Sequence, residues 1–264
     1  MCVFKAGKYE FFLKERTYVM GILNVTPDSF FDGNNYMEPS VAVAHAIQLQ
    51  AEGADIVDIG AQSTRPGYKE ISPEEEFERL IPVLKALKGK LHVPVSVDTY
   101  YPLVAEKALE HGASIINDVH GLKDKKMLEV VTNSDCGVVV MHDGPMNKTK
   151  NFFEERLRAL RDYNIQKDRI CFDPGIGFGK NYNEDIFAIK NIQNYRVDEL
   201  PIFIGLSNKR VIKNASGTSP LKDRLYGTIA ANILAVQNGA NFIRVHDVKA
   251  HVLALNSYRN ILKG

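Results

Sequence analysis

Several features that would mark whole classes of protein are missing from this sequence. It has no run of 18 apolar residues, so no membrane-spanning helix is expected. The net charge is only +1 and the basic residues form no patch, which argues against nucleic acid or an acidic membrane surface as a partner. Low-complexity segments and Pro/Gly/Ser-rich linkers are also absent, so the 264 residues are expected to form a single domain.

Cysteine is scarce. Cys2, Cys136 and Cys171 are far apart, and none of them lies in a C-x-x-C motif. An odd, dispersed set argues against a disulfide framework or a structural zinc site and fits a reducing cytoplasm. Cys136 and Cys171 adjoin apolar runs and are expected to be small core residues. The first 20 residues carry scattered charges and do not resemble a signal peptide, so we expect a cytoplasmic protein.

The chain does contain a unit that recurs eight times: a short apolar run, a polar turn and a helical stretch. The apolar runs are nearly continuous in Val, Ile, Leu and Phe, as is typical of strands buried on both faces. The expected strands cover residues 18–23, 55–59, 93–97, 114–116, 137–141, 169–172, 202–206 and 241–245. The expected helices cover residues 39–52, 73–88, 101–111, 124–133, 150–163, 183–193, 218–238 and 248–262.

Eight alternating units predict an α/β protein, a (β/α)8 TIM barrel. The alternative is an open doubly wound sheet, but its first turn is usually rich in glycine, and here that turn is NVTPDSF. Helix ends support the pattern: a Gly-Ala pair precedes three strands, and SPEEE at residues 72–76 supplies a cap, a proline and acids in the first turn. Residues 1–17 resemble a β-hairpin that would cap the N-terminal end of the barrel.

Every expected strand ends in a polar side chain, and the carboxyl ends of barrel strands form the catalytic rim. The strand ends carry, in chain order, Asn24, Thr64-Arg65-Pro66, Asp98, Asn117, His142, Asp173, Lys209 and the pair Arg244 and His246. Turn formation or helix capping explains any one of these residues and is favoured for Thr99, Asp118 and Asp247. It does not explain polar ends on eight strands together, so we expect a functional site.

Two kinds of ligand group fit this rim. Asp98, Asn117 and Asp173 offer acceptors that suit a flat heterocycle with an amidine-like N–H edge. Lys209 offers a cation for a ring carbonyl or ring nitrogen. The donors that suit an anion, such as phosphate or pyrophosphate, are Asn24, Arg65, Arg244 and His246.

Other catalytic arrangements are not evident. Paired histidines and acidic clusters with metal-ligand spacing are missing, although Mg²⁺ carried on a pyrophosphate could still touch Asn24. No Ser/His/Asp or Cys/His arrangement occurs, and His142 is expected to have a turn or packing role rather than to act as a base. The glycines at 175, 177 and 179 either permit a tight turn or let a ring or phosphate approach, and Phe178 could stack on a heterocycle.

In order and spacing, seven stretches of the chain resemble the dihydropteroate synthase family of the folate pathway. They are MGILNVTPDSFFDG, DIVDIGAQSTRPG, PVSVDTY, IINDVHG, FDPGIGFGK, the Lys209 region and RVHDV. The resemblance covers residue 20 to about residue 262, and it implies one pterin-binding TIM-barrel domain over residues 1–264, usually a homodimer. It also implies a transferase that condenses p-aminobenzoate with 6-hydroxymethyl-7,8-dihydropterin pyrophosphate and releases pyrophosphate.

The same resemblance implies roles for the rim residues. The pterin would be held by Asp98, Asn117, Asp173 and Lys209, in a slot lined by Met141 and Phe178. Pyrophosphate and its Mg²⁺ would be held by Asn24, the metal ligand, with Arg65, Arg244 and His246. Thr64 and Pro66 would enclose p-aminobenzoate, and residues 25–33 would form a mobile loop. Asp98, Asp173, Lys209 and Arg244 would be the catalytic residues, acting on a methylene cation and a departing pyrophosphate.

The chain departs from the family pattern in two places. After Ser207 it has Asn208 where the family usually has arginine, with Arg210 after the lysine, and the segment after His142 is short. Both departures concern the p-aminobenzoate side. They are the sequence support for one alternative, a non-catalytic pterin-binding paralogue. A second alternative is a methyltetrahydrofolate-dependent methyltransferase, which shares the barrel and the pterin carboxylates but would not use the STRPG loop, Arg65 or Arg244.

Overall fold

The computed structural model describes residues 3–26, 38–62 and 70–263. An eight-stranded parallel sheet curls into a barrel in the strand order β8-β7-β6-β5-β4-β3-β10-β9. Its strands are β3 Tyr18–Asn24, β4 Ile56–Gly60, β5 Val95–Asp98, β6 Ile115–Asp118, β7 Gly137–Met141, β8 Ile170–Asp173, β9 Phe203–Gly205 and β10 Phe242–Val245. The gap between β8 and β9 is closed by one parallel bridge, from Phe172 to Ile202. The predicted (β/α)8 barrel is confirmed.

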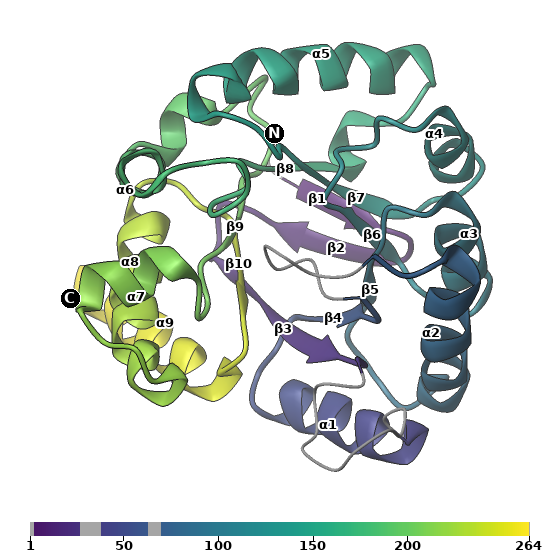
Figure 1. Cartoon of the computed structure of the whole chain (residues 1–264), viewed down its shortest axis with the longest axis horizontal. Helices are drawn as coiled ribbons and strands as arrows, with labels where there is room; N and C mark the ends of the chain where they lie inside the picture. The colour runs from purple at the N-terminus through teal and green to yellow at the C-terminus, as the bar shows by residue number, and fades with distance from the viewer. Residues whose placement is uncertain (1–2, 27–37, 63–69, 264) are drawn as a thin grey trace.

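The helices form a ring around the barrel (Figure 1). They are α1 Pro39–Ala51, α2 Pro73–Leu87, α3 Pro102–Glu110, α4 Lys125–Thr132, α5 Thr149–Asp162, α6 Tyr182–Lys190, α7 Arg210–Ser216, α8 Arg224–Gln237 and α9 Val248–Lys263. The helix expected over residues 218–238 was placed too early, because α8 begins at Arg224. Helix α7 was missed, since a helix of seven residues is too short to show a period in the sequence.

Helix ends follow the chemistry that the sequence predicts. Ser72 caps α2, where its hydroxyl accepts a hydrogen bond from the backbone N–H of Glu75 at 3.2 Å. Gly53, Gly112 and Gly239 have φ values of +100°, +98° and +103°. Each lies just after a helix and before a strand, where the left-handed conformation turns the chain back toward the barrel.

The N-terminal hairpin, β1 Val3–Ala6 and β2 Tyr9–Phe12, closes one end of the barrel. Its Phe4 and Phe11 pack against Phe242 with ring centroids 5.4 and 5.6 Å apart. The hairpin joins an apolar cluster with residues from inside the barrel, among them Tyr18, Met20, Ile56, Ile115, Val139, Cys171, Phe203 and Phe242. The hairpin therefore caps the N-terminal end, and the interior behind it is filled with apolar side chains.

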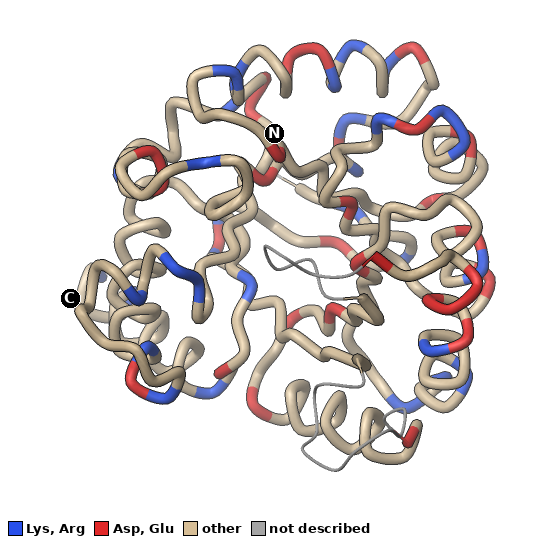
Figure 2. The backbone as a smooth tube through the Cα atoms, viewed as in Figure 1, with Lys and Arg blue, Asp and Glu red and all other residues tan. Residues whose placement is uncertain are grey.

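The polar part of the interior lies at the opposite end, where the strands finish. Acidic and basic positions occur on the strands within the ring as well as on the outer helices (Figure 2). Outside the barrel wall, two further apolar clusters pack the strands against the helices. Cys136 and Cys171 are buried thiols, as expected. The fold thus leaves the carboxyl ends of the strands as the place for a site.

Candidate active site

Three acceptor side chains lie at the carboxyl ends of β5, β6 and β8: Asp98, Asn117 and Asp173. Asp98 pairs in register with Asn117, and Asp173 pairs with Met141. Burial raises the pKa of Asp98 to about 7, against the opposing effect of Arg244, and it also raises the pKa of Asp173. Although Asp98 is only 7% exposed, its Oδ1 accepts no hydrogen bond from the described residues. A buried carboxylate oxygen without a donor is costly, so this wall is suited to a ligand with N–H groups.

Lys209 lies at the same rim, at the start of α7. Its Nζ donates to the Ile176 carbonyl at 2.6 Å and lies 4.8 Å from the centre of the Phe178 ring. Burial lowers its pKa to about 8, while Asp173 opposes the shift. Gly205 faces the ammonium, since a Cβ at that glycine would lie 3.7 Å from Nζ. The expected cation is therefore present beside the acceptor wall.

Arg244 is the second cation of the rim, and it is paired with two carboxylates. Its Nε donates to Asp58 Oδ2 at 2.6 Å, and its Nη2 donates to Asp98 Oδ2 at 3.0 Å. The charge of Asp58, together with that of Asp98, raises the pKa of Arg244 against the effect of burial. Sequence reasoning missed Asp58. The one feature that could have indicated it is the presence of an acidic residue within the apolar run of β4.

The loop after β8 is built on glycine. Gly175, Gly177 and Gly179 have φ values of +68°, +82° and +61°. A Cβ at Gly175 would lie 2.1 Å from the carbonyl oxygen of His142, so the loop packs closely on the end of β7. The backbone N–H of Gly177 donates to Asp185 Oδ1 at 2.7 Å. Asp185, a buried acid in the first turn of α6, was another residue that sequence reasoning missed.

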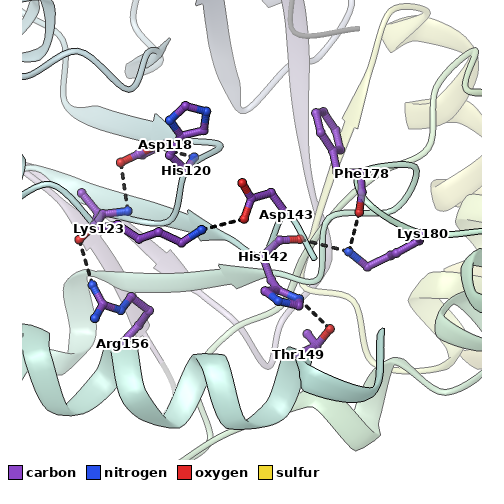
Figure 3. Close-up of polar contacts among 10 residues, drawn as sticks. Asp118, His120, Lys123, His142, Asp143, Thr149, Arg156, Phe178 and Lys180 are labelled. Carbon is purple, nitrogen blue, oxygen red and sulfur yellow. Dashed lines mark hydrogen bonds and ion pairs between the residues drawn. The ribbon is translucent and has the colours of Figure 1, made fainter. Parts of the chain in front are cut away.

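Lys180 fixes this loop from inside, as Figure 3 shows. Its buried ammonium donates to the carbonyls of His142 at 3.0 Å and Phe178 at 2.9 Å. His142 itself has the packing role that was expected. Its Nδ1 lies 2.9 Å from Thr149 Oγ1, its ring packs on Phe152, and burial lowers its pKa to about 4.

The turn roles favoured for Asp118 and Thr99 are also visible in their side-chain hydrogen bonds. Asp118 accepts a hydrogen bond from the backbone N–H of His120 at 2.7 Å (Figure 3). It accepts another from the backbone N–H of Leu122 at 2.9 Å. The Thr99 hydroxyl accepts one from the backbone of Tyr101 at 3.2 Å. Asp247 directly precedes α9, and its backbone carbonyl accepts a hydrogen bond from the backbone N–H of His251, one helical turn further on, at 3.3 Å.

The anion side is only partly described. Asn24 is the last residue of β3 and is half-buried, and His246 Nδ1 lies 2.9 Å from Ser207 Oγ. Thr64, Arg65, Pro66 and residues 27–33 of the expected first loop lie outside the described residues. Met141 is buried in a small cluster with Tyr100 and Val119, against which Phe178 packs, so both residues of the expected slot lie together.

Asn208, a departure from the family pattern, suits its backbone. Its φ of +61° is left-handed, which asparagine tolerates better than most residues. Its carbonyl accepts a hydrogen bond from Arg224 Nη1 at 2.8 Å, and its Nδ2 lies 3.4 Å from His246 Nδ1. The substitution leaves the neighbouring Lys209 at the rim. The short segment after His142 forms a single turn, Met146–Lys148, before α5.

A barrel whose rim combines buried acceptors with two cations is what a pterin-binding enzyme needs, and the family profile described as pterin binding enzyme matches residues 20–246. The dihydropteroate synthase of Clostridium beijerinckii is 43% identical over 92% of this chain and 94% of its own length. That of Bacillus subtilis is 40% identical over 89% of this chain and 85% of its own length.

Solved structures agree. Xanthomonas albilineans dihydropteroate synthase with 4-aminobenzoic acid superimposes with a TM-score of 0.94 at 38% identity, covering 100% of this chain and 99% of the other. The same enzyme in complex with 7,8-dihydropteroate gives a TM-score of 0.90 at 36% identity, covering 99% of each chain. The chain belongs to the dihydropteroate synthase family, transferases of folate biosynthesis. No helix within the described ranges has the length and apolar character needed to cross a membrane.

Proposed function

We propose that the protein condenses p-aminobenzoate with 6-hydroxymethyl-7,8-dihydropterin pyrophosphate, giving 7,8-dihydropteroate and pyrophosphate. Relatives of the same fold have been solved with 4-aminobenzoic acid and with 7,8-dihydropteroate. The observation that carries the proposal is the buried Oδ1 of Asp98, which accepts no hydrogen bond from the described residues and lies beside a second buried acceptor, Asn117. A pterin brings the N–H edge that such an oxygen lacks.

The pterin would lie between the acceptors and the cation. Asp98, Asn117 and Asp173 would accept hydrogen bonds from its N–H groups, and Lys209 would donate to a ring carbonyl or nitrogen. Met141 and Phe178 would line the slot, because they pack in one cluster beside these residues. Burial raises the pKa of Asp98 to about 7 and so disfavours its charged form. Hydrogen bonds from the N–H edge of a bound pterin would favour that charged form again.

The reaction would then depend on charge stabilisation. The bond between the pterin methylene carbon and pyrophosphate breaks, and its electron pair leaves with the pyrophosphate. Asp98 and Asp173 would stabilise the cation left on the methylene, while Arg244, Arg65 and His246 would stabilise the leaving group. The arylamine lone pair of p-aminobenzoate forms the new C–N bond, and its proton is lost to solvent. A neutral arylamine needs no strong base, so a packing role for His142 suits this chemistry.

A Mg²⁺ ion bound with the pyrophosphate belongs to this proposal, with Asn24 as its protein ligand. The described residues contain no group of three His, Cys, Asp or Glu side chains placed to hold a metal ion. They do offer an amide oxygen at the rim: Asn24 ends β3, and a Cβ at Gly60, the residue paired with Asn24, would lie 3.8 Å from Asn24 Oδ1. One protein oxygen, with phosphate and water completing the shell, suits Mg²⁺. Bound there, the ion would neutralise charge on the leaving pyrophosphate.

We further propose that the protein is a cytoplasmic homodimer. Large apolar side chains are exposed on the two C-terminal helices, with exposures of 77% for Tyr226, 58% for Leu253 and 79% for Ile261. Two free buried thiols, Cys136 and Cys171, are compatible with a reducing compartment. Size-exclusion chromatography with light scattering measures the mass in solution. A monomer at micromolar concentration would contradict the proposed dimer.

The test of the reaction is pyrophosphate release by the purified protein with both substrates. Release that depends on p-aminobenzoate is expected, and pterin binding without such release would favour a non-catalytic paralogue. Asp98→Ala and Lys209→Ala should each weaken pterin binding by about 10- to 100-fold, the range for a hydrogen bond to a charged group. Arg244→Ala should spare free 6-hydroxymethyl-7,8-dihydropterin and weaken its pyrophosphate ester. Calorimetry showing unchanged affinity of Arg244→Ala for the ester would contradict the assignment.

A further inference from the structure

Asp58 has a placement that the reaction above does not explain. It lies inside β4, ahead of the strand end at Gly60, and none of its side chain is exposed. Its Oδ2 accepts the hydrogen bond from Arg244 Nε, and Asn117 Nδ2 lies 3.5 Å from the same oxygen. Its Oδ1 accepts no hydrogen bond within the described ranges. The Asp58 carboxylate therefore pairs chiefly with Arg244.

Asp58 lies deeper in the barrel than the other carboxylate that binds Arg244. In the register of β4 and β5, Gly60 pairs with Asp98, whereas Asp58 pairs with Ser96 further from the rim. The guanidinium spans the two levels, with Nε on the deep carboxylate and Nη2 on the one at the rim. A guanidinium is a rigid planar fork, so fixing Nε also fixes the direction of both Nη groups.

We infer that Asp58 is a positioning residue: it holds Arg244 at Nε while the Nη groups of that arginine change partner from Asp98 to the pyrophosphate of the substrate. This inference rests on the pyrophosphate role proposed for Arg244. A pterin that engages both oxygens of Asp98, the Oδ1 that has no donor among the described residues and the Oδ2 now bonded to Arg244, displaces the arginine from that carboxylate when the substrate enters. With Asp58 present, the cation keeps a buried counter-charge throughout the exchange.

Loss of Asp58 would change this exchange in two ways. Among the described residues, Asp98 would be the remaining carboxylate paired with Arg244, so the pterin would compete with the arginine for it. The guanidinium would also lose its fixed direction toward the leaving group, and the placement of such a donor matters most in the transition state. Both effects require Arg244, which separates this role from a general contribution of Asp58 to the fold.

A double-mutant cycle tests the inference with Asp58→Asn, Arg244→Ala and the double variant. Calorimetry gives the affinity for 6-hydroxymethyl-7,8-dihydropterin, and steady-state pyrophosphate release gives kcat and KM. With Arg244 present, Asp58→Asn should lower kcat/KM by about 10- to 100-fold, mostly through kcat, and weaken the free pterin several-fold. With Arg244→Ala already in place, the same change should have less than about a twofold effect on either quantity.

Ser96→Ala is the matched control, because Ser96 is fully buried at the same depth on the neighbouring strand, and it should behave as wild type. Equal losses from Asp58→Asn in both backgrounds, or no loss in either, overturn the inference. If Arg244→Ala does not separate the ester from the free pterin, the role proposed for Arg244 fails instead. If circular dichroism shows that Asp58→Asn does not fold, Asp58→Glu replaces it in the same cycle. Asp58→Glu keeps the charge but moves the carboxylate by one methylene. Wild-type kinetics of Asp58→Glu would then refute the inference.

Discussion

Replacing Glu76 with glutamine should stabilise the protein at neutral and higher pH. Glu76 lies on α2 with 1% of its surface exposed. Burial is the main reason why its pKa rises to about 8; the charge of Asp98 adds to the shift, and Thr99 and Arg79 oppose it. The folded protein therefore has to keep a proton on this group or bear the cost of a buried charge.

The magnitude follows from the difference between the folded and unfolded states. An unfolded chain loses the Glu76 proton near the ordinary pKa of 4.5, whereas the folded protein keeps it up to about pH 8. Between these values the folded state binds more protons, so the free energy of unfolding falls as the pH rises. The slope is about 1.4 kcal/mol per pH unit, or roughly 2 kcal/mol between pH 6 and pH 7.5. For a chain of this size, that lowers Tm by about 4–8 °C.

Glu76→Gln keeps the shape of the side chain and removes the titration. Its free energy of unfolding should exceed that of wild type by an amount that grows by roughly 2 kcal/mol over the same interval. Urea unfolding at several fixed pH values measures this difference, in which the other titrating groups cancel. Glu78→Gln, at an exposed position of the same helix, is the control and should parallel wild type. Parallel curves for Glu76→Gln and wild type would refute the idea that Glu76 is protonated in the folded state.

Two further changes concern the loop after β8. Gly175→Ala should weaken pterin binding by more than about tenfold and lower Tm, because the new Cβ would meet the His142 carbonyl at 2.1 Å. Gly217→Ala has nearly the same φ, +67°, but open space around it, so it should cost only about 1 kcal/mol; equal costs at both sites would contradict the packing argument. Lys180→Met removes the donor to two loop carbonyls and should raise KM for the pterin ester by about 3- to 10-fold, while KM for p-aminobenzoate stays within about twofold. Steady-state kinetics decides, and an unchanged KM for the ester would count against a positioning role of Lys180.

Much of the site could be predicted because a parallel barrel brings all strand ends to one rim. Asp98, Asn117, Asp173 and Lys209 each occupy a strand end or the residues just after it, so their convergence follows from chain order alone. The turn role of Asp118 was also predictable, since its partners are the next few backbone N–H groups. The positions of these residues are set by the strand that carries them, and the partners of Asp118 are near neighbours in sequence.

The residues that were missed depend on contacts between distant parts of the chain. Asp58 and Arg244 are 186 residues apart, and no local pattern links them. Lys180 was visible in its motif, but its role depends on the carbonyl of His142, which follows β7, whereas Lys180 lies in the loop after β8. Glu76 was expected only as one of several acids that favour a helix N-terminus, and periodicity alone does not show that it turns inward. Helix α7 was missed because its seven residues are too few to show a helical period.

The charges of the rim indicate how binding and reaction are connected. Three carboxylates, Asp58, Asp98 and Asp173, share two cations, Arg244 and Lys209, so the fully ionised set carries one excess negative charge. Burial raises the pKa of Asp98 to about 7 and lowers that of Lys209 to about 8. In the absence of a ligand, burial therefore disfavours the charged form of each group. In the proposed reaction, a pterin with N–H donors would compensate Asp98 and would free the Nη groups of Arg244 where the pyrophosphate of the same substrate binds. Each half of the substrate would thus prepare the site for the other, so one arginine could be paired with carboxylates in this structure and still serve the leaving group.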